Sequence, residues 1–538
     1  MKKIIFVSLV LVSALAQDYV YKQYDIETIR QALQIPESEK QHLGIDNEQP
    51  TSTFVEATHQ LSDRQIVNTI RSYVASDTWT GKASLEIDKK FLHVIQKQDV
   101  HNELRHFLQR IKQQFLQTMY AEIEVIDLSQ NESVYQESVY LSAGQNNNIA
   151  ISTYHSYVCD YDVEVAESST TADPVIQNFN EGFHLQLIPF RSFDNQSVYL
   201  FGGASQVKLN KMDNVSPKEM SEVDLPQSEH SGSYGTFRVP IAKKSLLTYY
   251  NVNNKVHAIY VTIHDEKDLS SHVNKDLHLY DGGLLYYLLS TPDYENEDPF
   301  SKATHGVVLV NSSKVNGGAL FEEQVVTQKD IDHYQKTCQK LLGKHQICGR
   351  MIISSSQQNI LPKLKKIERD FGSTYNVHLR IYEMPNEKYK EVIEQRNITQ
   401  KQHKMIREYI VKDMFLSGVQ HQKSQSYNYT EYKTLQDYDV EVATNAAIGD
   451  PITGMVREGV DVSIQVEKNT EFLCHINLEK YDIAQPIATK NTLHGPIHVP
   501  KVSRVFLQQR LRLPSNKERI VKRITRGKST TLLTLECK

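Results

Sequence analysis

The sequence contains little tryptophan, cysteine, proline or glycine, and it has no long uncharged apolar run. One Trp, five Cys, 16 Pro and 22 Gly occur among 538 residues. So little Pro and Gly excludes a collagen-like chain and a Pro/Gly-rich low-complexity chain. Beyond the N-terminus no stretch approaches the ~18 uncharged apolar residues of a membrane-spanning helix, so we expect no transmembrane helix.

A strong excess of one charge is also missing. Lys and Arg total 60, Asp and Glu total 65, and the formal net charge is −5. A whole-chain nucleic-acid binder should be strongly basic, so this balance argues against nucleic acid as a partner. At ~150 residues per domain, the length predicts three to four domains.

Motifs that carry chemistry are absent from the sequence as well. It has no Cys-x-x-Cys, no His-Glu-x-x-His, no phosphate-binding loop ending in Gly-Lys-Ser/Thr and no Gly-x-Ser-x-Gly. These patterns are typical of redox and zinc sites, nucleotide sites and serine hydrolases. We therefore predict no catalytic residue, no metal site and no cofactor, and we expect that the protein is not an enzyme.

The N-terminus has the pattern of a secretory signal peptide. Lys2 and Lys3 precede a short apolar run, Ile4 to Val12, and Ala14-Leu15-Ala16 fits the small-x-small cleavage rule. The run is too short for the ~20 residues of a spanning helix. Residues 1–16 are therefore predicted to be a signal peptide, and the protein is expected to be exported to the periplasm, the outer membrane or the extracellular space.

Export would permit disulfide bonds. Cys338 and Cys348 would close a short loop and are the preferred candidate pair. With five cysteines in the chain, at least one thiol stays unpaired within it.

Short sequence matches recur in the same order along the chain, which indicates a tandem duplication. The hexapeptide Tyr161–Ala166 returns unchanged as Tyr438–Ala443, followed by Asp-Pro and Glu-Gly pairs at the same shift of 277. The other matches are Tyr24-Asp25, Ile29, Leu33 and Pro36 with Tyr280-Asp281, Leu285, Leu289 and Pro292 (shift 256); Val100, Leu104, Phe107 and Ile111 with Ile360, Leu364, Ile367 and Phe371 (shift 260); and Pro226 and Phe237–Pro240 with Pro500 and Leu511–Pro514 (shift 274). The largest change in shift comes from a charged helical segment inserted at Glu387 to Asp413.

Each half is expected to contain an α/β module followed by a β-rich module. Ser62 and Gln65 form a capping box that predicts a helix start. A hairpin is predicted at 85–95, an amphipathic helix at 100–111 and a half-buried strand at 121–128. The β-rich modules show short alternating runs separated by turn residues, which suits antiparallel sheets.

The predicted fold class is therefore α+β, with two tandem repeats. The expected domains are 1–16, the signal peptide; 17–135, the α/β module of repeat 1; 136–270, its β-rich module; 271–415, the α/β module of repeat 2; and 416–538, its β-rich module.

The α/β module resembles the small periplasmic ring-building modules of bacterial secretins, the outer-membrane proteins of type II and type III secretion. The resemblance lies in Ser84–Ile87, Phe91–Val94, Val100–Leu104 and the following strand Ala121–Leu128. In that family a strand pair is followed by a helix that begins near an acidic-x-x-hydrophobic turn.

The β-rich module resembles a stretch of the secretin channel domain, in which a Gly opens a strand, a Pro ends it and a Ser-x-Asp turn leads on. The residues are Asp173–Val175, Glu181-Gly182, Leu185–Pro189, Ser192–Asp194 and Val198–Leu200. The second copy keeps Asp450-Pro451 and Glu458-Gly459 but lacks the later Pro and the Ser-x-Asp turn. The pattern is most similar to secretin-related proteins of planctomycete-type bacteria.

Residues 501–538 are the one strongly charged part of the chain, with eleven Lys and Arg against two Glu, a net charge of +9. One hypothesis is contact with an anionic partner through Arg510, Arg512, Arg519, Lys522, Arg523 and Arg526. The other hypothesis is a solvated strand face, since Val505, Leu507, Leu511 and Leu513 would supply an apolar face opposite.

The resemblance implies an exported envelope assembly protein, part of a type II/III-like secretion or outer-membrane complex, that self-associates or binds envelope proteins. An alternative is a monomeric secreted or periplasmic binding protein without a pore. A hydrolase is the third hypothesis.

Overall fold

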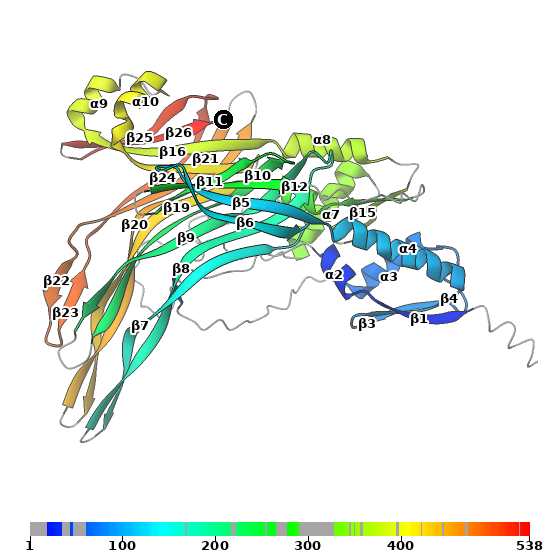
Figure 1. Cartoon of the computed structure of the whole chain (residues 1–538), viewed down its shortest axis with the longest axis horizontal. Helices are drawn as coiled ribbons and strands as arrows, with labels where there is room; N and C mark the ends of the chain where they lie inside the picture. The colour runs from blue at the N-terminus through cyan, green and yellow to red at the C-terminus, as the bar shows by residue number, and fades with distance from the viewer. Residues whose placement is uncertain are drawn as a thin grey trace, which may run out of the picture.

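The computed structural model describes residues 19–34, 44–46, 61–166, 169–216, 222–252, 255–264, 277–289, 328–343, 346–348, 350–355, 359–393, 397–420, 422–443, 446–468, 472–526 and 528–538. Antiparallel strands dominate; most helices lie at one end of a curved central sheet, and two short helices lie beside the smaller sheet that contains the C-terminal strand (Figure 1). The fold is α+β, as predicted. The expected signal peptide and the expected boundary at 270/271 lie outside the described residues.

The first α/β part has a three-stranded sheet in the order β1-β4-β3. Its elements are β1 (Val20–Asp25), α2 (Glu27–Leu33), α3 (Asp63–Tyr73), β3 (Ser84–Asp88), β4 (Phe91–Gln96) and α4 (Gln98–Phe115). The predicted capping box is confirmed, because Ser62 accepts from the Gln65 N–H and the Gln65 side chain accepts from the Ser62 N–H. The predicted hairpin and amphipathic helix are confirmed as β3–β4 and α4.

A second α/β part has a three-stranded sheet in the order β13-β15-β14. Its elements are β13 (Leu277–Asp281), α5 (Gly283–Leu289), α7 (Gln328–Leu342), β14 (Gln346–Cys348), β15 (Met351–Ser355) and α8 (Leu361–Phe371). The N–H of Ile26 donates to Lys90 O at 3.0 Å in the first part, and the N–H of Gly282 donates to Arg350 O at 2.6 Å in the second. In both parts, therefore, the start of the first helix is tied to the residue directly before the strand that leads to the last helix.

The central sheet contains nine strands in the order β2-β8-β9-β10-β19-β20-β21-β24, with β7 on the other edge of β8. The strands are β2 (Gly44–Asp46), β7 (Asn147–Ala166), β8 (Ser169–Arg191), β9 (Ser197–Val215), β10 (Val223–Pro240), β19 (Lys423–Ala443), β20 (Ala446–Lys468), β21 (Phe472–Ile483) and β24 (Val502–Leu513). The long hairpins β7–β8 and β19–β20 extend together beyond the rest of the sheet (Figure 1).

Two smaller sheets cover the central sheet, in the orders β11-β12-β5-β6 and β17-β25-β26-β16-β18. Their strands are β5 (Thr118–Asp127), β6 (Glu132–Ser142), β11 (Ser245–Val252), β12 (Lys255–His264), β16 (Thr374–Pro385), β17 (Asn397–Ile398), β18 (Ile410–Val419), β25 (Glu518–Arg526) and β26 (Ser529–Cys537). The first packs face to face with β7, β8, β9 and β10 around a buried apolar core, and the second packs in the same way on β20, β21 and β24. A two-stranded ribbon, β22 (Ala488–Asn491) and β23 (Pro496–Val499), completes the sheets.

The predicted helical insertion at 387–413 is confirmed only in part, because the short strand β17 separates its two helices and its end is a strand. The structure has α9 (Asn386–Val392), α10 (Gln400–Ile406) and the 3-10 turn η2 (Arg407–Tyr409) between β16 and β18. The helix prediction is wrong for residues 410–413, because they begin strand β18, which pairs with β16 along its length. Sheet pairing overrode the local helical pattern there.

The two halves of the chain share their sheet orders. β7-β8-β9-β10 is followed by β19-β20-β21-β24, and β11-β12-β5-β6 corresponds to β25-β26-β16-β18. Register shifts also fall at matching places: after Val158 and Leu435 in the long hairpins, after Leu246 and Ile520, and after Val125 and Ile381. The expected module boundaries at 135/136 and 415/416 fall inside β6 and β18, which hold the same position in their sheets.

No helix in the described part of the chain is both long enough and apolar enough to span a membrane.

Candidate functional site

The candidate site comprises three places in the central sheet. One is the joint, where β10 pairs with β19, and the other two are the outer edge strands. At the joint, β10 and β19 pair antiparallel from Gln227 opposite Tyr432 to Tyr234 opposite Gln425. This pairing joins β7–β10 to β19, β20, β21 and β24 in one continuous sheet. An antiparallel ladder satisfies the backbone N–H and C=O groups of both strands.

A buried ionic cluster lies at this joint. The Glu431 side chain is only 1% exposed, accepts a hydrogen bond from Arg457 Nε at 3.0 Å, and lies 3.3 Å from His230 Nε2. The His230 ring stacks on Tyr429, its cross-strand neighbour. Burial alone would raise the pKa of Glu431, but Arg457 and His230 outweigh burial and lower the pKa to about 2.

Because the pKa of Glu431 is depressed in the folded state, its ion pair stabilises the protein above about pH 4.5. That contribution should decrease as the pH falls below about 4.5 and be lost as it passes through the folded pKa of about 2, below which both states carry a protonated Glu431. The lowered pKa corresponds to about 3 kcal/mol. We expect Glu431→Gln to lose this amount at pH 7 and to converge with the unaltered protein near pH 2.

The measurement is the urea midpoint of both proteins from pH 7 to pH 2. Glu408→Gln is the matched control, because Glu408 is exposed on η2. A constant difference between Glu431→Gln and the unaltered protein at all pH values would contradict the assignment.

The outer edges of the central sheet are β7 and β24. Within the described residues β7 pairs only with β8, and β24 pairs only with β21. Two large side chains of β7 are exposed, Ile151 at 48% and Tyr154 at 65%. An edge strand with exposed apolar side chains is a template for pairing with another chain.

The basic residues singled out from the sequence lie on strands β24 and β25, in agreement with the hypothesis of a strand face. Arg519 Nη1 donates to Arg512 O at 2.8 Å, and Lys522 Nζ donates to Phe506 O at 2.7 Å. Arg523 Nη1 donates to the Tyr389 hydroxyl at 3.0 Å. The remaining two differ: Arg510 Nη2 lies 3.6 Å from Glu467, and the Arg526 side chain is not described.

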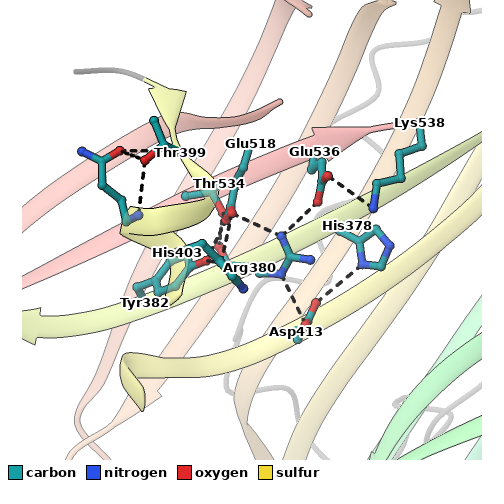
Figure 2. A network of polar contacts seen from close by, with 11 residues as sticks. His378, Arg380, Tyr382, Thr399, His403, Asp413, Glu518, Thr534, Glu536 and Lys538 are labelled. Atoms are coloured by element: carbon teal, nitrogen blue, oxygen red, sulfur yellow. Dashed lines mark hydrogen bonds and ion pairs between the residues drawn. The ribbon is translucent and has the colours of Figure 1, made fainter. Parts of the chain in front are cut away.

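A second polar cluster surrounds Arg380 in the sheet that contains β16 (Figure 2). Its guanidinium lies 3.4 Å from Asp413 and 3.3 Å from both Glu518 and Glu536. Burial disfavours the charged form of Arg380, but the carboxylates of Asp413 and Glu518 outweigh burial and raise its pKa. This arginine is therefore permanently charged and joins the strands β16, β18, β25 and β26.

Glu518 has further partners in the same cluster. The Tyr382 hydroxyl donates to Glu518 Oε1 at 2.7 Å, and the Thr534 hydroxyl donates to it at 2.6 Å. The His403 ring, on α10, lies 3.2 Å from Glu518 and connects the inserted helices to the sheet (Figure 2). The cluster braces the insertion against the sheet through charge-assisted hydrogen bonds.

The corresponding place in the other half has an ion pair of opposite polarity. Glu124 on β5 pairs with Lys244 beside β11, where the second half has Arg380 on β16 and Glu518 on β25. The exchange of acid and base keeps an ion pair between equivalent strands. We therefore interpret both pairs as structural connections between strands.

All five cysteines are buried and free in the structure. Cys338 and Cys348 lie in different hydrophobic clusters, so the disulfide expected from their spacing is not formed there. The close pair is Cys474 on β21 with Cys537 on β26, whose Sγ atoms are 3.5 Å apart. Sequence spacing gives no signal for this pair, because the two residues are 63 positions apart and meet only when the sheets pack.

Comparisons with known proteins find little. No protein-family model matches the chain, and no curated protein matches it. The secretin domain β-barrel of InvG from the Salmonella SPI-1 injectisome matches 53% of this chain and 96% of its own, with 8% identity and a TM-score of 0.23. The atomic model of the Salmonella SPI-1 basal body proteins InvG, PrgH and PrgK matches 53% of this chain and 68% of its own, with the same identity and TM-score. The likeness to secretin domains is therefore weak, and it establishes no function.

Proposed function

We propose that this protein is an exported, secretin-like assembly protein made of two equivalent repeats, and that copies of it join edge to edge. Its role is structural and not catalytic. The family assignment rests on the sequence resemblance described above. The assembly rests on the arrangement of the central sheet.

The repeat proposal is supported by the matching sheet orders and register shifts. It also fixes which residues are equivalent. Gly182 pairs with Ser152 and Val207, while Gly459 pairs with Tyr429 and Tyr481. These pairings give equivalences between β7 and β19 and between β9 and β21, at the sequence shifts of 277 and 274 that the short motifs show.

One observation carries the assembly proposal: the outer edges are equivalent to the two strands that already pair at the internal joint. β24 holds the place of β10, and β7 holds the place of β19. The β24 edge of one copy can therefore receive the β7 edge of the next, as β10 receives β19. Such a head-to-tail contact repeats from copy to copy and forms a ring if the rotation closes.

The internal joint also predicts the register of this contact. Val207 pairs with His230, and Tyr481 pairs with Arg504, so Arg504 is equivalent to His230. Because His230 lies opposite Tyr429, Arg504 should lie opposite Ser152 of the next copy. The neighbouring pairs are then Val505 with Ile151 and Leu507 with Ile149, which place apolar side chains on one face.

The side chains of Lys522 and Arg519 donate hydrogen bonds to backbone carbonyl oxygens of β24, at Phe506 and Arg512. Cations beside an edge strand oppose indiscriminate pairing. A carbonyl oxygen has two lone pairs, so the incoming N–H of the correct partner can share it. The edge is therefore selective and remains able to accept a partner.

We expect a Val505→Cys chain mixed with an Ile151→Cys chain to form a covalent dimer under oxidising conditions. The two thiols would be cross-strand neighbours, whose Cβ atoms lie about 4.5–5.5 Å apart. The measurement is non-reducing electrophoresis of the mixture, with analytical ultracentrifugation of the unaltered protein. In the ultracentrifuge we expect the unaltered protein to form dimers or larger species.

Each single variant alone is the first control, because it carries only one of the two thiols. Val505→Cys mixed with Ser152→Cys is the register control, since a shift of one residue moves the thiol to the other face of the sheet. Equal cross-linking of Ile151→Cys and Ser152→Cys would contradict the register. A strictly monomeric protein at high concentration would contradict assembly and favour a monomeric binding protein.

A further inference from the structure

The smaller sheets also meet at an internal joint. The edge strand β11 lies beside the edge strand β18, where Asn251 Nδ2 donates to Asp413 O at 3.4 Å. The Tyr249 ring lies 5.3 Å from the Phe415 ring and 6.1 Å from the His378 ring. Tyr249 is therefore the side chain of β11 that contacts both β18 and β16.

The opposite sides of these two sheets, away from the joint, carry charged residues at the positions equivalent to Tyr249 and His378. The register shifts after Leu246 and Ile520 make Tyr249 equivalent to Arg523. Pairing through β12 and β26 makes His378 equivalent to Glu122. The ring contact between Tyr249 and His378 thus corresponds, between two copies, to Arg523 facing Glu122.

A second pair follows from the joint of the central sheet. Gln227 lies opposite Tyr432, whose hydroxyl donates to Glu458 at 2.9 Å. At the outer edges, Lys501 is equivalent to Gln227, and His155 is equivalent to Tyr432. The partner of His155, Glu181, is equivalent to Glu458. Lys501 of one copy would then lie beside Glu181 of the next.

The present surroundings of these side chains leave room for such partners. Arg523 and Lys501 are exposed. Among the described residues, Glu122 lies 3.5 Å from His264, and Glu181 lies 3.0 Å from His155. The Glu122 side chain is 43% exposed. Both acids can therefore accept a cation that an approaching strand delivers.

We infer that the basic surface of β24 and β25 binds the acidic edge of a second copy, with Arg523 facing Glu122 and Lys501 facing Glu181. This inference rests on the proposed edge-to-edge assembly and adds the partner of the basic surface. The two ends of the chain are complementary in charge at the places where the internal joints predict contact. Charge complementarity of this kind selects the partner and its orientation.

The test is charge reversal in the full chain, with dissociation constants measured by sedimentation. Arg523→Glu and Glu122→Arg should each weaken assembly about tenfold, because each places like charges face to face. Mixing the two variants should restore assembly, since each end then meets an opposite charge. Arg369→Glu on α8 is the matched control: Arg369 is 76% exposed and away from both edges.

The unaltered protein should also dissociate more readily as salt rises from ~0.05 to ~0.5 M, because salt screens exposed ion pairs. If the unaltered protein assembles but both reversals leave its dissociation constant unchanged, the charge pairing is wrong and the strand pairing stands. If the unaltered protein is monomeric, both proposals fail. Loss of binding to phosphatidylglycerol vesicles in Arg523→Glu, with assembly unchanged, would assign the basic surface to lipid instead.

Discussion

Replacing Arg350 with Met is expected to lower the free energy of unfolding by about 3–5 kcal/mol. This is the cost of removing a buried cation from the polar groups that it contacts. Arg350 is fully buried at 0% exposure. Its guanidinium donates to Phe115 O at 2.6 Å and to Ala143 O at 3.1 and 3.2 Å. It also lies 3.7 Å from the Asp281 carboxylate.

These contacts join three parts of the molecule at one side chain. Phe115 ends α4, Ala143 follows β6, and Asp281 ends β13. The guanidinium passes over Gly144, where a Cβ would lie 1.2 Å from Nη1, so only glycine fits there. Met is apolar and unbranched but shorter than Arg and has no donor, so it would leave two carbonyl groups and one carboxylate without their partner.

The measurement is urea unfolding followed by the fluorescence of Trp79, the one tryptophan in the sequence. Trp79 packs against the core that contains Phe115, so it reports on the affected part. Arg369→Met is the control, because Arg369 is 76% exposed and should change stability by less than about 0.5 kcal/mol. A loss in Arg350→Met no larger than in this control would contradict the role assigned to Arg350.

Folding in an oxidising buffer is expected to join Cys474 to Cys537 and to stabilise the protein by about 4 kcal/mol, the entropy of closing a loop of this length. Both side chains are fully buried, and their Sγ atoms lie 3.5 Å apart. The bond would tie β21 of the central sheet to β26 of the covering sheet. The hydrogen bond with Cys474, together with burial, raises the pKa of the Cys537 thiol.

A thiol with a raised pKa is a poor nucleophile, so the folded reduced protein should oxidise slowly and the bond should form during folding. Mass spectrometry after alkylation should count three free thiols in protein folded with oxidised glutathione, against five in reduced protein. Cys338→Ser/Cys348→Ser is the control and should still form the bond. Five free thiols after oxidative folding would show the prediction to be wrong.

Local structure in this chain could be predicted because short-range contacts decide it. The Ser62–Gln65 capping box depends on residues three positions apart, and α4 follows from apolar side chains at helical spacing between Val100 and Ile111. The same reasoning was wrong for residues 410–413, where pairing with β16 decides the conformation. A strand face was one of the two hypotheses for the basic residues after 501, and the structure places most of them on the two strands β24 and β25.

The amino-acid sequence alone was enough to predict α3, the β3–β4 hairpin and α4 of the first α/β part, the alternation of the strands and the collinear matches between the two halves. Only the tertiary structure decided that β10 pairs with β19, which strands remain as edges, and that Arg350, Glu431 and the Cys474–Cys537 pair lie at junctions. Periodicity and capping act within a few residues of the chain. Sheet order and buried charge pairs depend on contacts between distant residues, which form only when the layers pack.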